Sequence, residues 1–306
     1  MGRFIVRRLL LAIPVLIGVS IIAFLILHLS PGDPAELLAG DEASQTDIQI
    51  IREKFGLDRP LGTQYLLFIR GVITGDLVSM KYDVPVMEIV GTRLKNTLIL
   101  SSAAIVISVS VGIAAGVLSA VHRYSWVDYT STFIALLGVS MPVFWWGLLM
   151  ILLFSVNLMC LPSGGMGGFR HLIMPAIALG TASTGIIARM TRSSMLDVLQ
   201  QDYITTAKAK GLLRRLVIYR HGLRNALIPT VTVIGLQFGY MLAGAVLTET
   251  VFSWPGIGRL LVNSIMGRDY PVVQTALLVI ALIFVLANLA VDMLYALLDP
   301  RIRYND

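Results

Sequence analysis

The sequence has 306 residues, of which 56% are hydrophobic and only 14% are charged, and its mean hydropathy is +0.81. These values exclude an ordinary soluble globular protein and indicate an integral membrane protein. The formal net charge of +6 does not favour nucleic-acid binding. The Lys and Arg residues lie at the edges of apolar runs, where they set membrane topology.

Residues 1–30 predict a cytoplasmic N-terminus and a first transmembrane helix. A basic patch of Arg3, Arg7 and Arg8 precedes an apolar run at residues 9–29, which has about the twenty residues that a helix needs to cross a bilayer. No small-residue cleavage site follows the run. We therefore interpret it as a retained helix and not as a signal peptide.

Residues 31–95 predict an external helical segment. Thr46 and Gln49 have the spacing of a capping box, and Gly56 follows as a helix stop. A second amphipathic stretch, at residues 61–74, also ends at a glycine. The segment is either an outer face for a soluble partner or a lid that only covers the helix ends.

Five further apolar runs bring the predicted number of transmembrane helices to six. They lie at residues 96–121, 129–156, 172–188, 228–247 and 272–298. A core domain of residues 96–298 and a cytoplasmic C-terminus of residues 299–306 follow from these runs. The basic loops all fall on one side, so both termini are predicted to be cytoplasmic.

The sequence offers no catalytic and no metal-binding constellation. It has no glycine-rich phosphate loop, no nucleophile elbow and no plausible carboxylate pair, and Cys160 is its only cysteine. We therefore predict a protein that is not an enzyme, with the energy for any uphill transport supplied by another chain. Asp292 is the one acidic residue inside a predicted span, where it has either a structural role or a transport role.

The basic insert at residues 189–228 joins the fourth and fifth predicted spans. We expect the fourth helix to continue to Leu199, and Asp202 then opens a short helix of small residues that Gly211 stops. Pro229 is expected in the first turn of the fifth span. The insert is either a docking element for a cytoplasmic protein or a solvated loop that only sets topology.

The insert resembles the "EAA" loop of permease subunits in ATP-binding-cassette importers, specifically the dipeptide, oligopeptide and nickel permease family. The similarity extends along nearly the whole chain. It includes PGDP at 31–34, FGLDRPLGTQY at 55–65, GVSMPVFWWG at 138–147, ARMTRSSMLDVL at 188–199, LTETVFSWPGIGRLL at 247–261, RDYPVVQ at 268–274 and LDPRIRY at 298–304.

The resemblance implies an all-α membrane protein with the MetI-like fold of a type I importer permease. It also implies a prokaryotic cytoplasmic (inner) membrane as the location. The implied partners are a second homologous permease, two cytoplasmic ATP-binding subunits, an external substrate-binding protein and membrane lipid. ATP is then bound by the partner subunits, and no cofactor is expected on this chain.

By position, the residues after Gln201 correspond to the coupling helix of the family, so the resemblance implies a coupling helix there. The implied contacts with an ATPase are Asp202, Tyr203, Thr206, Ala207, Ala209, Lys210 and Gly211. Thr205 stands where the family motif has its first acidic residue, so an acidic contact there is not expected. Candidates for a translocation path are Trp145, Trp146, Tyr240 and Asp292, although aromatic residues in spans also serve for packing.

The function implied by the resemblance is import of small peptides delivered by the binding protein. Import of nickel, a metal chelate or glutathione by the same architecture is the first alternative. An ion-coupled secondary transporter working alone and a membrane scaffold are the others. Gly112, Gly116, Pro142 and Gly244 lie in the spans, where they permit either close packing or local bending.

Overall fold

The computed structural model describes residues 2–29, 33, 35–36, 43–54 and 56–298. Predictions for the C-terminal residues 299–306 and for most of the PGDP segment lie outside these residues. The described chain is helical and forms two compact units. Unit 1 contains residues 1–5, 98–254 and 286–306, and unit 2 contains residues 6–97 and 255–285. Three of the four unit boundaries fall inside long helices, and the fourth, between residues 254 and 255, falls between two helices.

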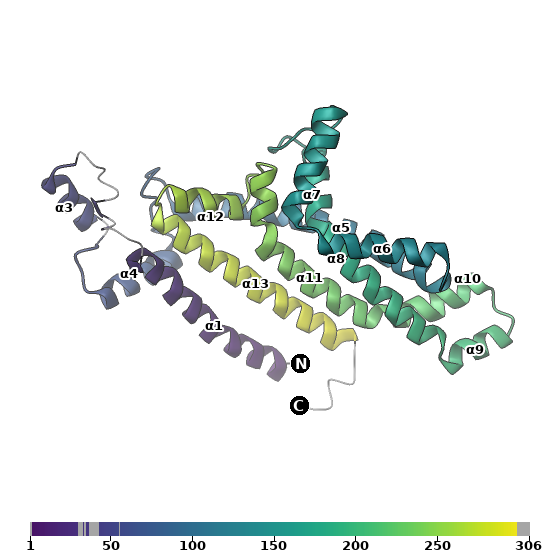
Figure 1. Ribbon diagram of the computed structural model, residues 1–306. Coiled ribbons are helices and arrows are strands. Elements are labelled where there is room, and N and C mark those ends of the chain that lie inside the picture. Colours follow the sequence, from purple (N-terminus) through teal and green to yellow (C-terminus); the bar gives the residue numbers. More distant parts are fainter. Residues whose placement is uncertain (1, 30–32, 34, 37–42, 55, 299–306) are drawn as a thin grey trace. The chain divides into compact units, whose positions relative to one another are not determined.

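Figure 1 shows these helices in chain order. They are α1 (Gly2–Leu29), α3 (Gln45–Lys54), α4 (Leu61–Thr74), α5 (Val86–Val121), α6 (Trp126–Ser140), α7 (Val143–Met150), η1 (Ile151–Asn157), α8 (Phe169–Leu199), α9 (Asp202–Ala209), α10 (Arg214–Leu216), η2 (Val217–Leu223), α11 (Arg224–Val251), α12 (Ile257–Met266) and α13 (Tyr270–Leu298). The elements η1 and η2 are π-helices.

Five of the described helices are long and apolar enough to cross a membrane, and a bent pair brings the number to six. The pair consists of α6 and the α7–η1 helix, which meet at an angle of 105°. The sequence predicted one continuous span at residues 129–156. Pro142 explains the break, because a proline disfavours helical backbone at the residue before it, and Met141 is extended, with φ −89° and ψ 135°.

Two other helices begin earlier than predicted. Helix α5 starts at Val86, ten residues before the predicted run at residues 96–121. Helix α11 continues directly from η2, so Pro229 lies inside the helix and not in its first turn. The π-helix explains this difference, because it carries helical backbone from Val217 into α11 without a break. The predicted position of Pro229 in a first turn was therefore wrong, whereas both predicted spans are present.

The core of unit 1 is built on α8, which packs against α6, α7 and α11. Figure 1 shows α8 and α11 side by side over much of their length. Small residues allow α5 to approach α8 closely. A Cβ atom at Gly116 would lie 2.6 Å from the carbonyl oxygen of Ala188, and one at Gly112 would lie 3.0 Å from that of Thr184. A Cβ atom added at Gly244 would have no neighbour within 4 Å, so of these three glycines only Gly112 and Gly116 have a close-packing role.

Unit 2 joins distant parts of the chain through buried polar contacts. Asp269 is 1% exposed and accepts hydrogen bonds from the Ser79 hydroxyl and from the Met80 backbone N–H. The Thr97 hydroxyl accepts a hydrogen bond of 2.9 Å from the Ile257 backbone N–H, at the start of α12. These contacts hold the segment between α4 and α5 and the segment around α12 in one unit.

The two predicted helix stops in the segment after α1 are present, but the predicted capping box is not. Helix α3 begins at Gln45, one residue before Thr46, and the Gln49 side-chain amide donates a hydrogen bond of 3.0 Å to Glu53. Gly56 and Gly75 both have positive φ angles, +65° and +80°, as expected for residues that end helices. Arg52 of α3 pairs with Asp33. Burial raises the pKa of Asp33, but hydrogen bonds from the Ala35 N–H and from Arg52 outweigh this effect, so the pKa is lowered.

Candidate coupling surface

Helix α9 forms a short element of its own between α8 and α10. The backbone of Gly211 has φ +74°, a conformation that glycine adopts without steric cost, and it turns the chain out of α9. Two side chains of α9 are buried, Ile204 at 0% and Ala207 at 7% exposure, and they cluster with Val217 of η2. The small helix is therefore anchored by its own chain through one narrow face.

The remaining coupling candidates lie on the exposed part of this short segment. Asp202, Thr206 and Ala209 are all exposed. Their spacing of four and three residues places them on one face, because a helix turns about 100° per residue. That face lies opposite Ile204 and Ala207. The structure therefore separates Ala207, which faces its own chain, from these three outward-facing residues.

Tyr203, Lys210 and Gly211 flank the outward-facing residues and are also exposed. The Tyr203 side chain is 41% exposed, and its hydroxyl oxygen accepts a hydrogen bond of 2.9 Å from the side-chain amide of Asn225. This amide also donates to the His221 carbonyl oxygen at 3.1 Å. One side chain at the junction of η2 and α11 therefore holds the position of α9.

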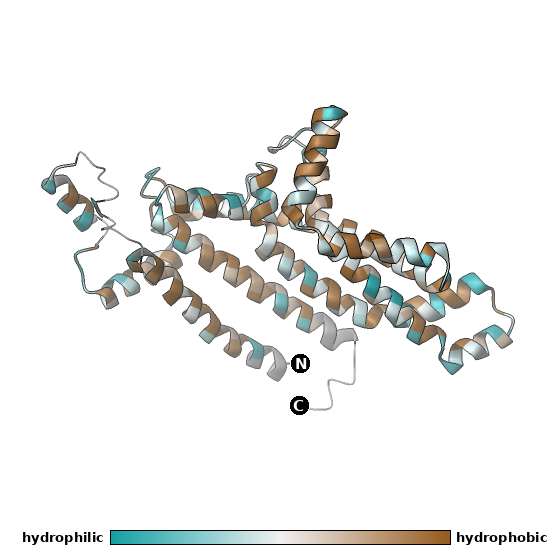
Figure 2. Cartoon of the chain, in the orientation of Figure 1, coloured by the Kyte–Doolittle hydropathy of each residue, from teal (hydrophilic) through white to brown (hydrophobic). Residues whose placement is uncertain are grey.

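Apolar residues and cations are exposed together at the end of α9 and in the segment that follows it. The exposed fraction is 75% for Leu213 and 52% for Tyr219. The exposed cations are Lys208, Lys210, Arg214, Arg215, Arg220 and Arg224. Figure 2 shows polar positions between apolar ones in α9, whereas α1 is apolar over most of its length. A surface that combines these groups fits a protein partner better than the hydrocarbon phase.

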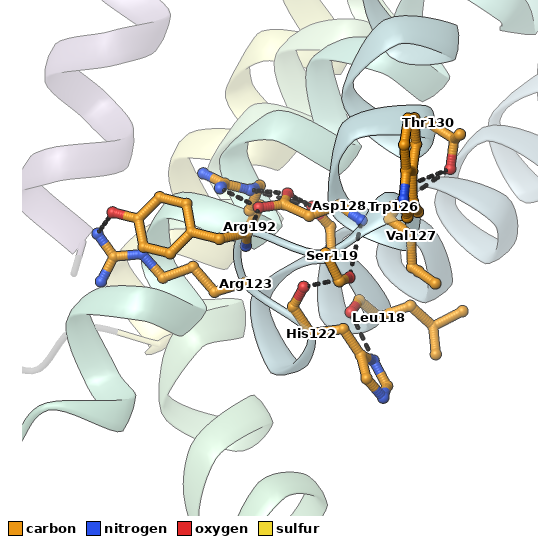
Figure 3. Close-up of polar contacts among 11 residues, drawn as sticks. Leu118, Ser119, His122, Arg123, Trp126, Val127, Asp128, Thr130 and Arg192 are labelled. Atoms are coloured by element: carbon orange, nitrogen blue, oxygen red, sulfur yellow. Dashed lines mark hydrogen bonds and ion pairs between the residues drawn. The ribbon is translucent and has the colours of Figure 1, made fainter.

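An ion pair fixes the end of α8 that carries α9. The guanidinium of Arg192 donates two hydrogen bonds to the carboxylate of Asp128, at 2.7 and 2.8 Å. Ser119 of α5 donates to the same carboxylate at 2.5 Å and accepts from Arg192 at 3.0 Å. Figure 3 shows the three side chains converging from α5, α6 and α8. Asp128 is only 2% exposed.

The sequence analysis missed Asp128 as a partner of Arg192. The sequence offers one local signal for Asp128. Ser125 and Asp128 are three residues apart, which is the spacing between an N-cap residue and an acidic residue in the first turn of a helix. The structure has this cap, with the Asp128 N–H donating to the Ser125 hydroxyl at 3.4 Å. The pairing with Arg192 has no sequence signal, because the two residues are 64 positions apart.

The four candidates for a translocation path lie on three different helices. Trp145 and Trp146 are neighbours on α7, with ring centroids 6.1 Å apart and an edge-on arrangement. Tyr240 on α11 is 63% exposed, and Asp292 on α13 is partly buried and has a polar interaction. Helix α7 packs against α11, but among the described residues the tryptophans have a ring contact only with each other. Their role in a path stays a prediction.

The fold is that of a membrane-spanning protein whose short helix α9 is anchored through one face and exposes its other residues. Two family models match the chain. "Binding-protein-dependent transport system inner membrane component" matches residues 112–304, and the corresponding N-terminal model matches residues 1–101. The chain belongs to this family of transport permeases, which confirms the family that the sequence motifs predicted.

Curated relatives match the chain over nearly its full length. The dipeptide transport system permease protein DppB of Alkalihalophilus pseudofirmus is 48% identical over 99% of this chain and 100% of its own length. DppB of Escherichia coli K12 is 46% identical, with 99% of both chains covered. The glutathione transport system permease protein GsiC of Escherichia coli O6:H1 is 47% identical over 99% of this chain and 100% of its own length.

A solved structure of the MetNI methionine ABC transporter in an inward-facing conformation has the same fold. Its matching chain has a TM-score of 0.61 and is 19% identical, over 70% of this chain and 98% of its own length. An amino acid ABC transporter matches with a TM-score of 0.52 and 16% identity. These neighbours confirm the predicted MetI-like permease fold.

Proposed function

We propose that the chain is the permease subunit of an ATP-driven importer for small peptides. It pairs with a second homologous permease, two cytoplasmic ATP-binding subunits and an external substrate-binding protein. It lies in a prokaryotic inner membrane with both termini in the cytoplasm. The observation that carries this proposal is α9, which is anchored by Ile204 and Ala207 and presents an opposite face of exposed residues.

In the proposed mechanism, α9 transmits movement from the ATP-binding subunits to the spans. An ATPase holds the outward-facing residues Asp202, Thr206 and Ala209, and closure of the nucleotide-bound ATPase pair moves α9. The contacts of Ile204 with Val217 and Leu199 pass this movement to α8 and to the η2–α11 helix. The spans then change between inward-open and outward-open states.

The substrate class follows from the relatives and not from a defined pocket in this chain. Two of the relatives described above are dipeptide permeases and the third is a glutathione permease. Glutathione is itself a small peptide, so small peptides are a substrate class that covers the names of all three relatives. We therefore propose peptides of two or three residues as the substrate, with selectivity set by the binding protein. Nickel or a metal chelate remains the alternative cargo.

Affinity purification from native membranes is the first test of the proposed assembly. The tagged chain is extracted in mild detergent, and the co-purifying proteins are identified by mass spectrometry. We expect a second permease of similar size and one or two kinds of ATP-binding subunit. A chain that purifies alone and still transports peptide after reconstitution would show that the basic insert only sets topology.

A substitution at Ala209 tests the docking face separately from the fold. Ala209→Trp adds a bulky side chain on the side opposite Ile204, so the chain is expected to fold but to lose its ATPase. Ala209→Ser is the matched control and should retain both ATPase binding and uptake. Co-purification of the ATPase at the original level with Ala209→Trp contradicts the proposed docking face.

A further inference from the structure

A cavity of about 250 Å³ lies between α5, α6 and α8 in unit 1. Small or apolar residues form most of its wall, among them Ala115 and Gly116 of α5, Ala135 and Val139 of α6, and Ala188 of α8. All three helices belong to candidate membrane spans. An apolar cavity of this kind holds water poorly, so a hydrocarbon chain is its natural occupant.

Two arginines of α8 line one end of this cavity, and they have different surroundings. Arg192 is already bound to the carboxylate of Asp128. Arg189 is exposed, and within the described part of the chain no ion pair or hydrogen bond to its side chain is observed. The cavity therefore combines an apolar interior with one cation that is available to an anion.

The outer face of α6 beside this cavity has the character of a membrane-facing surface. Phe133 and Ile134 are 61% and 67% exposed, as expected for side chains in contact with lipid. Trp126 and Tyr129, at the same end of α6 as Asp128, are 84% and 59% exposed. Exposed Trp and Tyr side chains are typical of the boundary between the hydrocarbon phase and the headgroups. The polar end of α6 therefore lies at headgroup depth, where a phosphate is in reach of Arg189.

We propose that this cavity is a binding site for one anionic phospholipid, such as phosphatidylglycerol. One acyl chain occupies the space between α5, α6 and α8, and the phosphate binds the guanidinium of Arg189. The acyl chain restores dispersion contacts that the wall residues otherwise lack. The charge of Arg189 selects anionic over zwitterionic headgroups. This proposal goes beyond the transport function and does not depend on which substrate is imported.

Native mass spectrometry of the purified importer, with its partner subunits, tests the proposal. The complex is exposed to phosphatidylglycerol or phosphatidylcholine with the same acyl chains. We expect preferential retention of phosphatidylglycerol and a loss of about fivefold in its affinity with Arg189→Gln, the effect of one arginine near a headgroup. The matched control is Arg59→Gln, which removes an exposed cation that lines neither the cavity nor the coupling surface, and it should leave the affinity unchanged.

The apolar half of the site is tested by filling the cavity while Arg189 is retained. Ala115→Phe occupies the space that the acyl chain requires and should reduce retention of phosphatidylglycerol. Ala114→Phe adds the same group at the neighbouring exposed position and should have no effect. The melting temperature of each complex shows whether it is folded, and Arg189→Gln provides an independent test if Ala115→Phe is not.

Three outcomes would overturn the lipid site. The first is equal retention of the two lipids by the unmodified complex. The second is unchanged retention in both Arg189→Gln and Ala115→Phe. The third is cross-linking of a cysteine at Val139, placed in a Cys160→Ser chain, to the partner permease, which would show that protein covers the cavity. Loss of peptide uptake is not used as a readout, so failure of the lipid site and failure of the proposed function are distinguishable.

Discussion

The C-terminal end of α8 and the short helix α9 are adjacent in the chain, but they are built in opposite ways. The end of α8 is fixed by close backbone packing at Gly116 and by the ion pair between Asp128 and Arg192. Helix α9 is held through two buried side chains and exposes the rest. The difference is the one expected if α8 is rigid and if α9, as proposed, contacts a partner protein.

The largest expected effect follows from overpacking the α5–α8 contact. In Gly116→Val the new Cβ atom meets the Ala188 carbonyl oxygen at 2.6 Å, and a backbone atom cannot move aside as a flexible side chain does. We expect destabilisation of more than about 3 kcal/mol and loss of most folded protein. Size-exclusion chromatography and thermal unfolding of the purified complex measure this effect.

Gly244→Val is the matched control for that substitution. The same side chain is added to a transmembrane glycine whose new Cβ atom would have no neighbour within 4 Å. The change in stability should therefore stay within about 0.5 kcal/mol. If both variants lose stability equally, the loss comes from the backbone freedom of glycine, and close packing at Gly116 is not the reason for it.

The next largest effect is expected from the ion pair at the end of α8. Asp128→Ala removes the carboxylate and leaves Arg192 and Ser119 without their shared acceptor, at an expected cost of about 3 kcal/mol. Asp128→Ala combined with Arg192→Met should cost less than the sum of the two single substitutions. Strictly additive losses in thermal unfolding would mean that the two side chains do not stabilise one another.

The helices could be predicted because the bilayer fixes their length. Helix α13 begins two residues before the predicted run at residues 272–298 and ends where that run ends. The third predicted span is present only as a bent pair of helices. The sequence did not predict this bend, because the length of an apolar run does not show where the helix axis changes direction. Pro142 was recognised as a residue that permits bending, but the 105° angle depends on how α6 and α7 pack against α8.

The residue range of α9 could be predicted from the sequence, but which of its faces is buried could not. Asp202 and Gly211 mark the start of α9 and the turn after it, as the sequence indicates. The inward position of Ala207 depends on Leu199 of α8 and Val217 of η2, and Val217 lies beside α9 because the chain turns at Gly211. The partners of Arg192 could not be predicted for the same reason, since they come from distant helices.

A smaller effect on stability, with a larger effect on transport, is expected at Gly211. Valine at a φ of +74° costs about 1 to 2 kcal/mol, and the strain is relieved by a shift of α9 relative to α8. Gly211→Val should therefore lower peptide uptake per ATP hydrolysed in proteoliposomes. Gly211→Asn is the control, because asparagine tolerates this backbone conformation, and it should retain coupling. Unchanged uptake in Gly211→Val contradicts a role for α9 in coupling.

The smallest expected effect concerns the single hydrogen bond between Asn225 and Tyr203. Tyr203→Phe removes this bond at the edge of the coupling surface and should cost about 1 kcal/mol or less, because both groups are exposed to water. Asn225→Ala removes the same bond and also the contact with the His221 carbonyl oxygen, so its cost should be larger. If Tyr203→Phe reduces ATPase binding while Asn225→Ala does not, the tyrosine hydroxyl acts directly on the partner. If both reduce it together, the bond acts by positioning α9, as expected for a helix whose own chain anchors it through only two buried side chains.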